Sequence, residues 1–468
     1  MRHRQTGVGA PGFDAPAGTA VAAGPAGEHA IVIGASVAGL LAARVLSDSF
    51  GGVTVLERDA LPTELTDRRA IPQGRHAHAL QFGGQEALER LLPGYQDEAV
   101  VAGAPPRVDA EVVRFRFGGH RLRQVSIGTD AVFSSRAFLE GLIRRRINAL
   151  GNVSIRDRCG VLGLLSDDGG VRGVVAQDRA PGSEEEALRA DLVVAASGRA
   201  SKLPGWLESM GYEPPAEERV QVGIMYASRH LRLRPGALGT DTIVTSGPVP
   251  GRARGMALFL EEHDRWLLTL YGYGSEHRPP TDDDAFIGFA ATVADPDVLT
   301  AIQEAQPLDE ITTHAYPAGV RHRYERLRRF PEGLLVIGDA ICSFNPIYGQ
   351  GLTVAALQAE ALARCLEQDE HQLARRFFKA ASRPVDHAWK LSTGADLALP
   401  EVDARAALPD RIVSRYIARL LRVAAHDEHV ARAFVEVTGL LKPPTSLLHP
   451  AIAARVLRGS LAPPPGSS

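Results

Sequence analysis

Residues whose types and spacing suit a bound nucleotide lie near the start of the chain. Gly34, Ser36 and Gly39 occupy the three positions of a Gly-x-Gly-x-x-Gly turn, with serine in the middle. The first glycine allows a sharp turn, and the third lets a helix pack closely against a strand. Glu57 follows 18 residues after Gly39, where a carboxylate can accept hydrogen bonds from ribose hydroxyls. This pattern predicts a dinucleotide with an unphosphorylated adenosine ribose, hence FAD or NAD.

A second stretch, GDAICSFNPIYGQGLTVAAL, begins at Gly338 and distinguishes the two cofactors. Asp339 can accept hydrogen bonds from a polyol such as the ribityl chain of a flavin. Pro346 has a fixed φ and no N–H, so it makes a rigid apolar wall. Gly349 and Gly351 let the backbone approach a planar ring closely. The helix expected after them points its positive end at that ring and stabilises an anionic reduced flavin, so the prediction is FAD.

The elements that position these residues follow from the apolar pattern. Residues 30–33 (AIVI) predict a strand, residues 40–50 a helix, and residues 53–57 (VTVLE) a second buried strand after two glycines. These elements form a βαβ unit that is expected to bind the nucleotide. The alternative is an ordinary α/β turn that binds no ligand. Neighbouring positions of both motifs complete the predicted cofactor site, namely Ala38, Arg58 and Leu352.

The late motif, together with the N-terminal turn, resembles the group A flavoprotein monooxygenases, whose fold is that of p-hydroxybenzoate hydroxylase. The stretch SSRAFLEGLIRRRINALGNVSI is similar to the family's arginine-bearing helix, which implies that Arg136 contacts the FAD phosphates. Residues 73–80 (QGRHAHAL) lie where the family places an arginine near the flavin, here Arg75. The third motif of the family, usually Asp-Gly, here reads Ser197-Gly198-Arg199, and this departure weakens any inference about NAD(P)H. The alternatives are that Arg136 is an ordinary helix-surface residue and that Arg75, His76 and His78 belong to an ordinary polar loop.

The resemblance implies an α/β fold. An FAD-binding Rossmann-like domain of the glutathione-reductase/p-hydroxybenzoate-hydroxylase type carries an inserted antiparallel β-sheet substrate domain and a C-terminal helical region. We expect the FAD domain over residues 29–104, 131–218 and 313–395, and the substrate sheet over 105–130 and 219–312. Residues 396–460 should be helical, and 1–28 and 461–468 should be flexible tails. The C-terminal helices have amphipathic spacing, which suits packing on the protein's own body, a cover over the active site or contact with a membrane surface.

Alternating apolar residues in the substrate sheet predict a wall over the flavin. The candidates for substrate contact, each of which is alternatively a plain core residue, are Met225, Tyr226, Phe259, Leu268 and Tyr271. No clear general base stands among them. We expect no catalytic side chain beyond the flavin site itself, which Pro346, Gly349 and Gly351 shape.

Composition limits the other classes of function. The net charge is −3, which argues against a nucleic-acid binder, and no apolar run is long enough to span a membrane. The three cysteines, Cys159, Cys342 and Cys365, are too widely spaced for a disulfide framework or a metal site, so a cytoplasmic protein without a metal is expected. The basic run at residues 321–330 (RHRYERLRRF) is interpreted as a solvated helix face or connector.

The reaction is predicted from a finer resemblance. Residues 351–355 (GLTVA) are similar to a run in squalene epoxidases, and with residues 73–80 they resemble the bacterial polyene epoxidases of polyether ionophore biosynthesis, of lasalocid and monensin type. In such enzymes reduced flavin binds O2 at C4a and passes one oxygen atom to an alkene. The resemblance implies a large apolar polyene substrate, O2 as cosubstrate, and NAD(P)H or a partner flavin reductase as electron source. An aromatic hydroxylase and a geranylgeranyl-reductase-like alkene reductase remain the alternatives.

Overall fold

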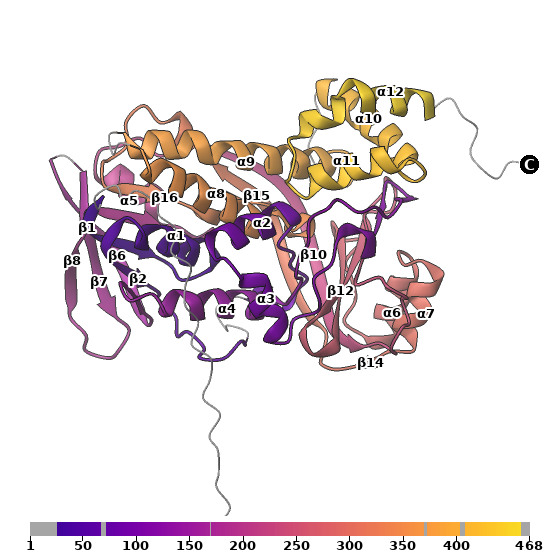
Figure 1. The fold of residues 1–468 in the computed structure, drawn as a ribbon, viewed down its shortest axis with the longest axis horizontal. Helices are drawn as coiled ribbons and strands as arrows, with labels where there is room; N and C mark the ends of the chain where they lie inside the picture. The colour runs from indigo at the N-terminus through magenta and orange to yellow at the C-terminus, as the bar shows by residue number, and fades with distance from the viewer. Residues whose placement is uncertain (1–25, 67–71, 169, 369–371, 403–407, 460–468) are drawn as a thin grey trace, which may run out of the picture.

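The computed structural model describes residues 26–66, 72–168, 170–368, 372–402 and 408–459 (Figure 1). Most of the expected N-terminal tail and all of the expected C-terminal tail lie outside these residues. Residues 27 and 28, which we assigned to the N-terminal tail, instead begin the first strand, β1 (Gly27–Ile33).

A parallel sheet of five strands carries both predicted cofactor motifs. Its order is β16-β9-β1-β2-β5, with β2 (Phe50–Leu56), β5 (Val153–Arg156), β9 (Leu192–Ala195) and β16 (Leu334–Val336). The helices α1 (Val37–Ser47), α4 (Arg136–Asn148) and α8 (Gln350–Leu366) pack along it, with α1 against both of the others. Strands covered on both faces need continuous apolar runs, which is why residues 30–33 and 192–195 are all apolar and buried.

The first βαβ unit differs from the prediction in one detail. Helix α1 ends at Ser47, and Gly51 and Gly52 lie inside β2 rather than before it. An added Cβ at Gly51 would lie 3.0 Å from the backbone oxygen of Glu28 on β1. These glycines therefore belong to the strand and lie close to its neighbour.

The second sheet contains the expected substrate strands, but it also takes in β15 and β17 from residues 313–395, which we assigned to the FAD domain. It is mixed rather than purely antiparallel because β11 runs parallel to β3. Its order is β17-β15-β10-β13-β12-β11-β3-β4, and β14 pairs with β10. The bounds are β3 (Val113–Phe117), β4 (His120–Arg121), β10 (Glu217–Arg232), β11 (Ile243–Ser246), β12 (Arg254–Glu261), β13 (Arg265–Tyr273), β14 (Gln306–Pro307), β15 (Thr312–His322) and β17 (Cys342–Ser343). Strand β17 comes from the late cofactor motif, so that motif is joined by hydrogen bonds to the substrate sheet.

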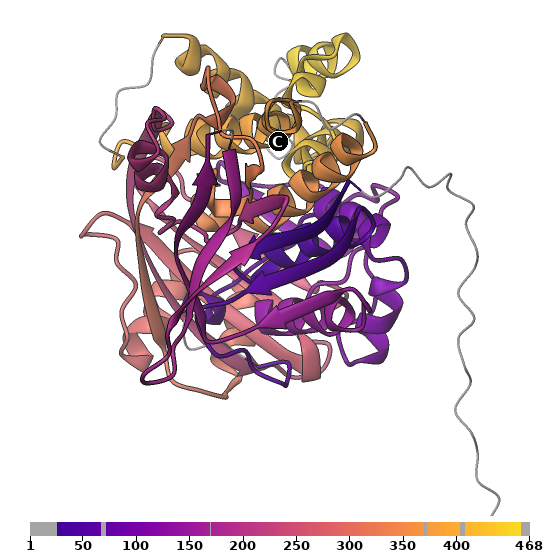
Figure 2. The same ribbon diagram turned by 90° about the vertical axis from the view of Figure 1, so that its left-hand side faces the viewer.

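Smaller elements complete the body of the molecule. A three-stranded sheet, β6 (Cys159–Asp167), β7 (Gly170–Asp178) and β8 (Glu185–Arg189), contacts the parallel sheet through β7 and β9 (Figure 2). The short helices are α2 (Phe82–Leu91), α3 (Tyr95–Val101), α5 (Leu203–Ser209), α6 (Asp283–Ala291) and α7 (Pro296–Gln303). The 3-10 turns are Pro72–Arg75, Ala110–Val112, Glu262–Asp264, Tyr324–Arg326, Gly338–Ala340, Pro346–Tyr348 and Pro444–Leu448.

The C-terminal part is helical, as expected. Helix α9 (Leu373–Asp396) lies along α8, and α10 (Leu408–Ala424), α11 (Glu428–Thr438) and α12 (Pro450–Gly459) form a group at one end of it (Figure 1). Leu420, Val430 and Val456 share an apolar core with Leu122 and Val125 beside the substrate sheet. The amphipathic faces are thus buried at least in part on the protein's own body. Among the described residues, no helix has the length and hydropathy to cross a membrane.

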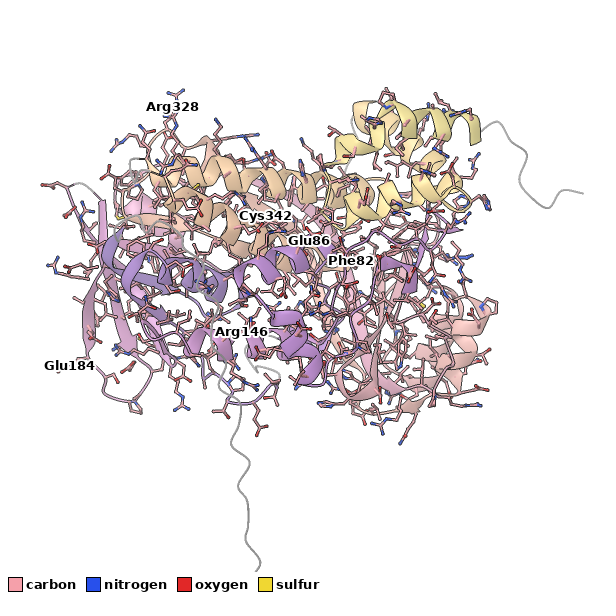
Figure 3. All side chains as sticks on the ribbon, in the orientation of Figure 1. Phe82, Glu86, Arg146, Glu184, Arg328 and Cys342 are labelled. Carbon is pink, nitrogen blue, oxygen red and sulfur yellow. The ribbon has the colours of Figure 1, made fainter. Side chains whose placement is uncertain are left out.

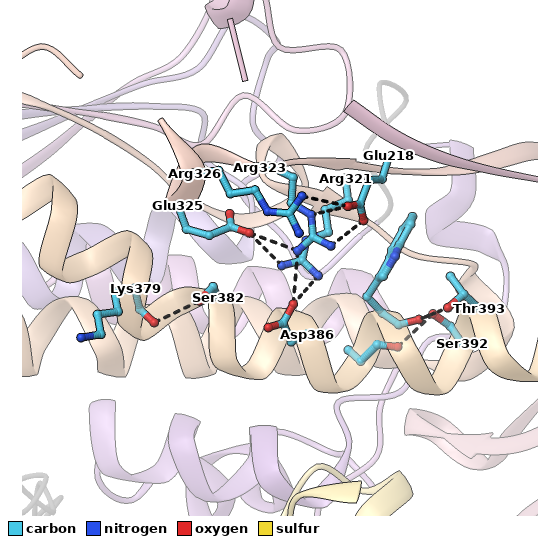
Figure 4. A network of polar contacts seen from close by, with 12 residues as sticks. Glu218, Arg321, Arg323, Glu325, Arg326, Lys379, Ser382, Asp386, Ser392 and Thr393 are labelled. Atoms are coloured by element: carbon cyan, nitrogen blue, oxygen red, sulfur yellow. Dashed lines mark hydrogen bonds and ion pairs between the residues drawn. The ribbon is translucent and has the colours of Figure 1, made fainter. Parts of the chain in front are cut away.

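The basic run at residues 321–330 is in part the expected connector, with Arg326, Arg328 and Arg329 exposed, but its first two arginines are not solvated. The side chain of Arg321, on β15, is 1% exposed and lies 2.6 Å from the carboxylate of Asp386 on α9. Arg323 pairs with Glu218, Glu325 and the same Asp386 (Figure 4). Arg321 on β15 and Arg323 just after it both reach acidic partners, and the resulting network joins α9 to the substrate sheet.

Candidate flavin site

The glycines of the first motif are required by close packing. Gly34 has a φ of +107°, and an added Cβ would lie 2.6 Å from the backbone oxygen of Ala196 on the neighbouring segment. A Cβ on Gly39 would lie 1.9 Å from the backbone oxygen of Gly34. The turn therefore brings the N-terminus of α1, with its unpaired amides and partial positive charge, to the carboxyl ends of the strands.

Glu57 directly follows β2 and closes over this turn. Its Oε2 accepts a hydrogen bond from the backbone amide of Ala35 at 3.0 Å, and its Oε1 accepts one from the amide of Asp59 at 3.1 Å. The side chain is 6% exposed. The neighbouring Arg58 is exposed and binds Asp59 at 3.1 Å. The carboxylate is thus fixed beside the motif, at the end of the strand where a ribose would bind.

Arg136 is the first residue of α4 and reaches into the same motif. Its Nη2 donates to the hydroxyl of Ser36 at 3.0 Å, and that hydroxyl donates to Glu140 at 2.9 Å. The Nε of Arg136 is buried without a hydrogen-bond partner, while Nη1 lies 3.5 Å from Nε2 of His78. These contacts explain why serine stands in the middle of the motif, since its hydroxyl links α1 to α4. Neither Glu140 nor His78 had been assigned to the cofactor site, and no spacing rule in the sequence marks them.

The late motif is packed directly on the first. Gly338 has a φ of +72°, its amide donates to Oε1 of Gln358 at 2.7 Å, and an added Cβ would lie 2.7 Å from Cβ of Ala38. The next residue, Asp339, is exposed although both of its neighbours are buried. Desolvation by the surrounding protein raises the pKa of Asp339, and the positive charges of Arg136 and Arg199 oppose that effect. An accessible carboxylate among buried residues is what a ligand contact requires.

The turn before α8 is fixed by hydrogen bonds to the segment before α2. Gly349 has a φ of +62° and caps α8, and an added Cβ would lie 2.9 Å from Nε2 of Gln81. Gln81 donates from Nε2 to the oxygen of Tyr348 at 3.0 Å and from its amide to the hydroxyl of Thr353 at 2.8 Å. The first turn of α8 lies beside Asp339, because an added Cβ on Gly351 would be 3.7 Å from the carboxylate of Asp339. Pro346 and Leu352 are half-buried in the same segment.

The predicted apolar wall is divided between two faces of the substrate sheet. Strand pairing places Tyr226 opposite Tyr271. On β12, Phe259 is an even number of residues from the residue opposite Tyr271, so its side chain lies on the same face. Leu268 instead packs in the core formed with α6 and α7 on the other face, and Met225 alternates with Tyr226 and so also faces that way. Tyr226, Phe259 and Tyr271 therefore share one face, and their role as a wall over the flavin stays a prediction. The expected inclusion of Met225 and Leu268 on that face is corrected.

Imidazoles stand on the same face as the wall. Nδ1 of His76 lies 2.7 Å from the hydroxyl of Ser228, and its ring centroid is 5.9 Å from that of Tyr226 and 5.7 Å from that of His314. Burial, and then the charge of His314, lowers the pKa of His76 to about 4. The pKa of His314 is lowered by burial and by the charge of Arg199. At neutral pH these rings are uncharged, so they can accept hydrogen bonds but are weak bases.

Two further arginines border the site. Arg199 belongs to the segment that differs from the family's third motif. It is exposed, and its guanidinium lies over the ring of Tyr316, 4.6 Å from the ring centroid. Arg75 is exposed at the end of a 3-10 turn, next to His76.

Figure 3 shows Phe82 and Cys342 near the middle of the molecule, where they are buried, and Glu184 and Arg328 at its edges. Cys159, Cys342 and Cys365 are buried free thiols, and the described residues include no group of side chains arranged to hold a metal ion.

The assembled side chains fit FAD. Glu57 suits the adenosine ribose, the α1 N-terminus with Arg136 suits the pyrophosphate, and Asp339 suits the ribityl chain. The N-terminus of α8 beside Gly349 suits the isoalloxazine ring. Two observations suit a ligand. The buried Nε of Arg136 makes no hydrogen bond and has only a long ion pair with Glu140, at 3.8 Å, and the carboxylate of Asp339 is accessible. The individual contacts with FAD remain predictions.

Comparison with known proteins agrees with this fit. Residues 28–374 match the FAD binding domain family. Protein Rv3254 of Mycobacterium tuberculosis is 36% identical over 396 residues, which cover 81% of this chain and 82% of that protein.

Three solved structures have a similar fold. A flavoprotein/dehydrogenase from Cytophaga hutchinsonii has a TM-score of 0.66 at 16% identity, with 92% of this chain and 99% of that one covered. The flavin-dependent brominase Bmp2 has a TM-score of 0.64 at 16% identity, with coverages of 92% and 98%. The p-nitrophenol 4-monooxygenase PnpA of Pseudomonas putida has a TM-score of 0.63 at 16% identity, with coverages of 88% and 98%. The chain therefore belongs to the FAD binding domain family and has the fold of the group A flavoprotein monooxygenases.

Proposed function

We propose that this protein is an FAD-dependent monooxygenase that converts an alkene of a large apolar polyene into an epoxide. One oxygen atom of O2 enters the alkene, the other leaves as water, and a nicotinamide cofactor, used directly or through a flavin reductase, supplies the two electrons. The bound flavin supplies the activation of O2. The chain's own residues hold the flavin, exclude water and orient the alkene.

The observation that carries this proposal is the junction between the late motif and the substrate sheet. Strand β17 of that motif pairs with β15, and the site face of the sheet presents Tyr226, Phe259 and Tyr271. An apolar wall joined to the flavin loop suits a substrate whose double bond is itself the nucleophile, because such a substrate needs no base. It also excludes water from the reacting atoms.

A second candidate, aromatic hydroxylation, is favoured by the imidazoles on that face. A neutral ring at His76 or His314 can accept a hydrogen bond from the hydroxyl of a phenol and so orient the aromatic ring and increase its electron density. The lowered pKa of each imidazole makes full transfer of the proton unfavourable. The sequence had suggested no base, because His76 lies outside the substrate sheet and His314 is an isolated residue on β15. PnpA, which has the same fold, is named for a reaction of a phenol.

Labelled oxygen separates the candidates. Purified protein with FAD is supplied with NADH, NADPH or a flavin reductase, a polyene or a phenol, and 18O2, and the products are analysed by mass spectrometry and NMR. Incorporation of one labelled oxygen with loss of alkene protons supports epoxidation. Incorporation into an intact aromatic ring supports hydroxylation. Saturation of the alkene without oxygen would identify a reductase and contradict both proposals.

A further inference from the structure

A buried carboxylate joins the flavin loop to the substrate sheet and to α9. Asp396, the last residue of α9, is 2% exposed. Its Oδ1 accepts hydrogen bonds from the hydroxyl of Tyr273 at 2.8 Å, the hydroxyl of Tyr348 at 2.8 Å and Nδ2 of Asn345 at 2.9 Å. One oxygen thus receives donors from β13 and from both ends of the turn that leads into α8.

Asn345 extends this connection to a second strand. Its Oδ1 accepts from the hydroxyl of Tyr226 on β10 at 3.1 Å, and its Nδ2 donates to the hydroxyl of Tyr273 at 3.1 Å. Asn345 also caps the 3-10 turn Pro346–Tyr348, whose apolar face is predicted to lie against the flavin. The tyrosine that forms part of the substrate wall is therefore two hydrogen bonds away from Asp396, through Asn345.

The residues around Asp396 favour its ionised form at neutral pH. Burial raises the pKa of Asp396 to about 6, against the lowering effect of its hydrogen bonds with Tyr348, Tyr273 and Asn345. The other titratable groups that face it are tyrosines on β10, β13 and the turn, namely Tyr226, Tyr271, Tyr273 and Tyr348. Burial raises the pKa of each, so all four remain protonated. Glu401, further along the chain from Asp396, lies 3.8 Å from Nε2 of His277.

We propose that Asp396 is a positioning residue for the flavin, which holds the Asn345–Gly349 turn in the geometry that receives the isoalloxazine ring and couples that turn to the tyrosines of the substrate sheet. The assignment rests on the proposed flavin-dependent function. It adds a residue that the family match does not include, because that match ends at residue 374.

Protonation of Asp396 should weaken this hold. An ionised carboxylate oxygen can accept three hydrogen bonds, whereas a neutral acid has less acceptor capacity and gains a donor of its own. As the pH falls through about 6, at least one of the three donors therefore loses its acceptor. The effect of pH on the stability of the apoprotein has the opposite sign. Because the pKa of Asp396 is raised to about 6 on folding, its contribution lowers the free energy of unfolding as the pH rises from about 4 to about 6. Loss of FAD affinity without loss of stability is thus the signature of a positioning role.

The test compares FAD dissociation constants from about pH 5 to about pH 8 for the wild type, Asp396→Asn and Tyr348→Phe, with the midpoint temperature of each apoprotein. For the wild type, affinity should fall as the pH decreases through about 6. Asp396→Asn should bind FAD roughly tenfold more weakly at pH 7.5, the equivalent of one weakened charged hydrogen bond, and should lose the transition near pH 6. Tyr348→Phe, which removes one hydroxyl, should show a smaller loss of affinity and keep the transition.

Asp386→Asn provides the matched control, since Asp386 lies on the same helix but pairs with Arg321 and Arg323 away from this turn. It should lower the midpoint temperature and leave the pH profile of FAD binding intact. Equal FAD affinity and an equal pH profile in Asp396→Asn and the wild type would overturn the inference and leave the proposed function standing. A wild-type protein that binds no FAD at any pH would overturn both. If Asp396→Asn does not fold, an unchanged FAD affinity in both Tyr348→Phe and Tyr273→Phe overturns the inference.

Discussion

Gly338 and Ala38 lie so close together that a β-carbon on Gly338 would be 2.7 Å from the Cβ of Ala38. This contact joins the two cofactor motifs, which are separated by most of the chain. It places Asp339 beside the N-terminus of α1 and Arg136, and so turns two separate sequence patterns into one site.

Gly338→Ala should lower both stability and FAD retention. The substitution combines backbone strain at a φ of +72° with a steric clash, and we expect it to cost about 2–4 kcal/mol of unfolding free energy. Gly236→Ala is the matched control, because Gly236 has a φ of +75° and no atom near its missing side chain. It should cost only the strain, on the order of 1 kcal/mol. Urea unfolding measures both, and equal losses would contradict the close packing of the two motifs.

Asp339→Ala should separate cofactor binding from stability. Asp339 is exposed, and desolvation raises its pKa, so we expect its charge to add no stability before a ligand binds. We expect FAD affinity to fall about tenfold to a hundredfold, as for loss of a hydrogen bond to a charged group, with the apoprotein as stable as the wild type. Full flavin absorbance and full activity in the purified variant would remove Asp339 from the site.

Asp386→Ala should be destabilising, because among the described residues it leaves the buried Arg321 with the more distant Glu325 as its remaining ion-pair partner, at 3.2 Å. Breaking a fully buried ion pair from one side costs about 3–5 kcal/mol, and because the Asp386 side chain is 39% exposed we expect a loss at the lower end of that range. Arg326→Ala tests the same network at its exposed edge, where the Arg326 side chain is 62% exposed and lies 3.6 Å from Glu218. That change should cost less than about 1 kcal/mol. Chemical denaturation of the two variants should differ clearly, and similar values would contradict the buried network.

Phe259→Ala and Leu268→Ala should have different consequences. Phe259 lies on the site face, so its truncation should raise the KM of an apolar substrate. Leu268 is fully buried on the opposite face with α6 and α7, so its truncation should cost about 2–5 kcal/mol of stability and leave KM unchanged. Steady-state kinetics and thermal unfolding distinguish the two effects. A changed KM in folded Leu268→Ala would restore Leu268 to the wall.

Local sequence determined the elements and the two motifs. The spacing of Gly34, Gly39 and Glu57 and the run from Gly338 to Gly351 are short-range patterns, and their turns need glycine for steric reasons that act within a few residues. The same holds for the C-terminal helices, whose apolar periodicity is continuous. For these segments the prediction and the structure agree.

Only the tertiary structure decided which distant side chains meet. The faces of Met225 and Leu268, the burial of Arg321, and the contacts of Glu140, His78 and Asp396 depend on strand register and on packing between segments far apart in the chain. Alternation tells which residues share a face but not which face meets the cofactor. A carboxylate at the end of a helix, such as Asp396, resembles an ordinary surface residue until folding surrounds it with three donors.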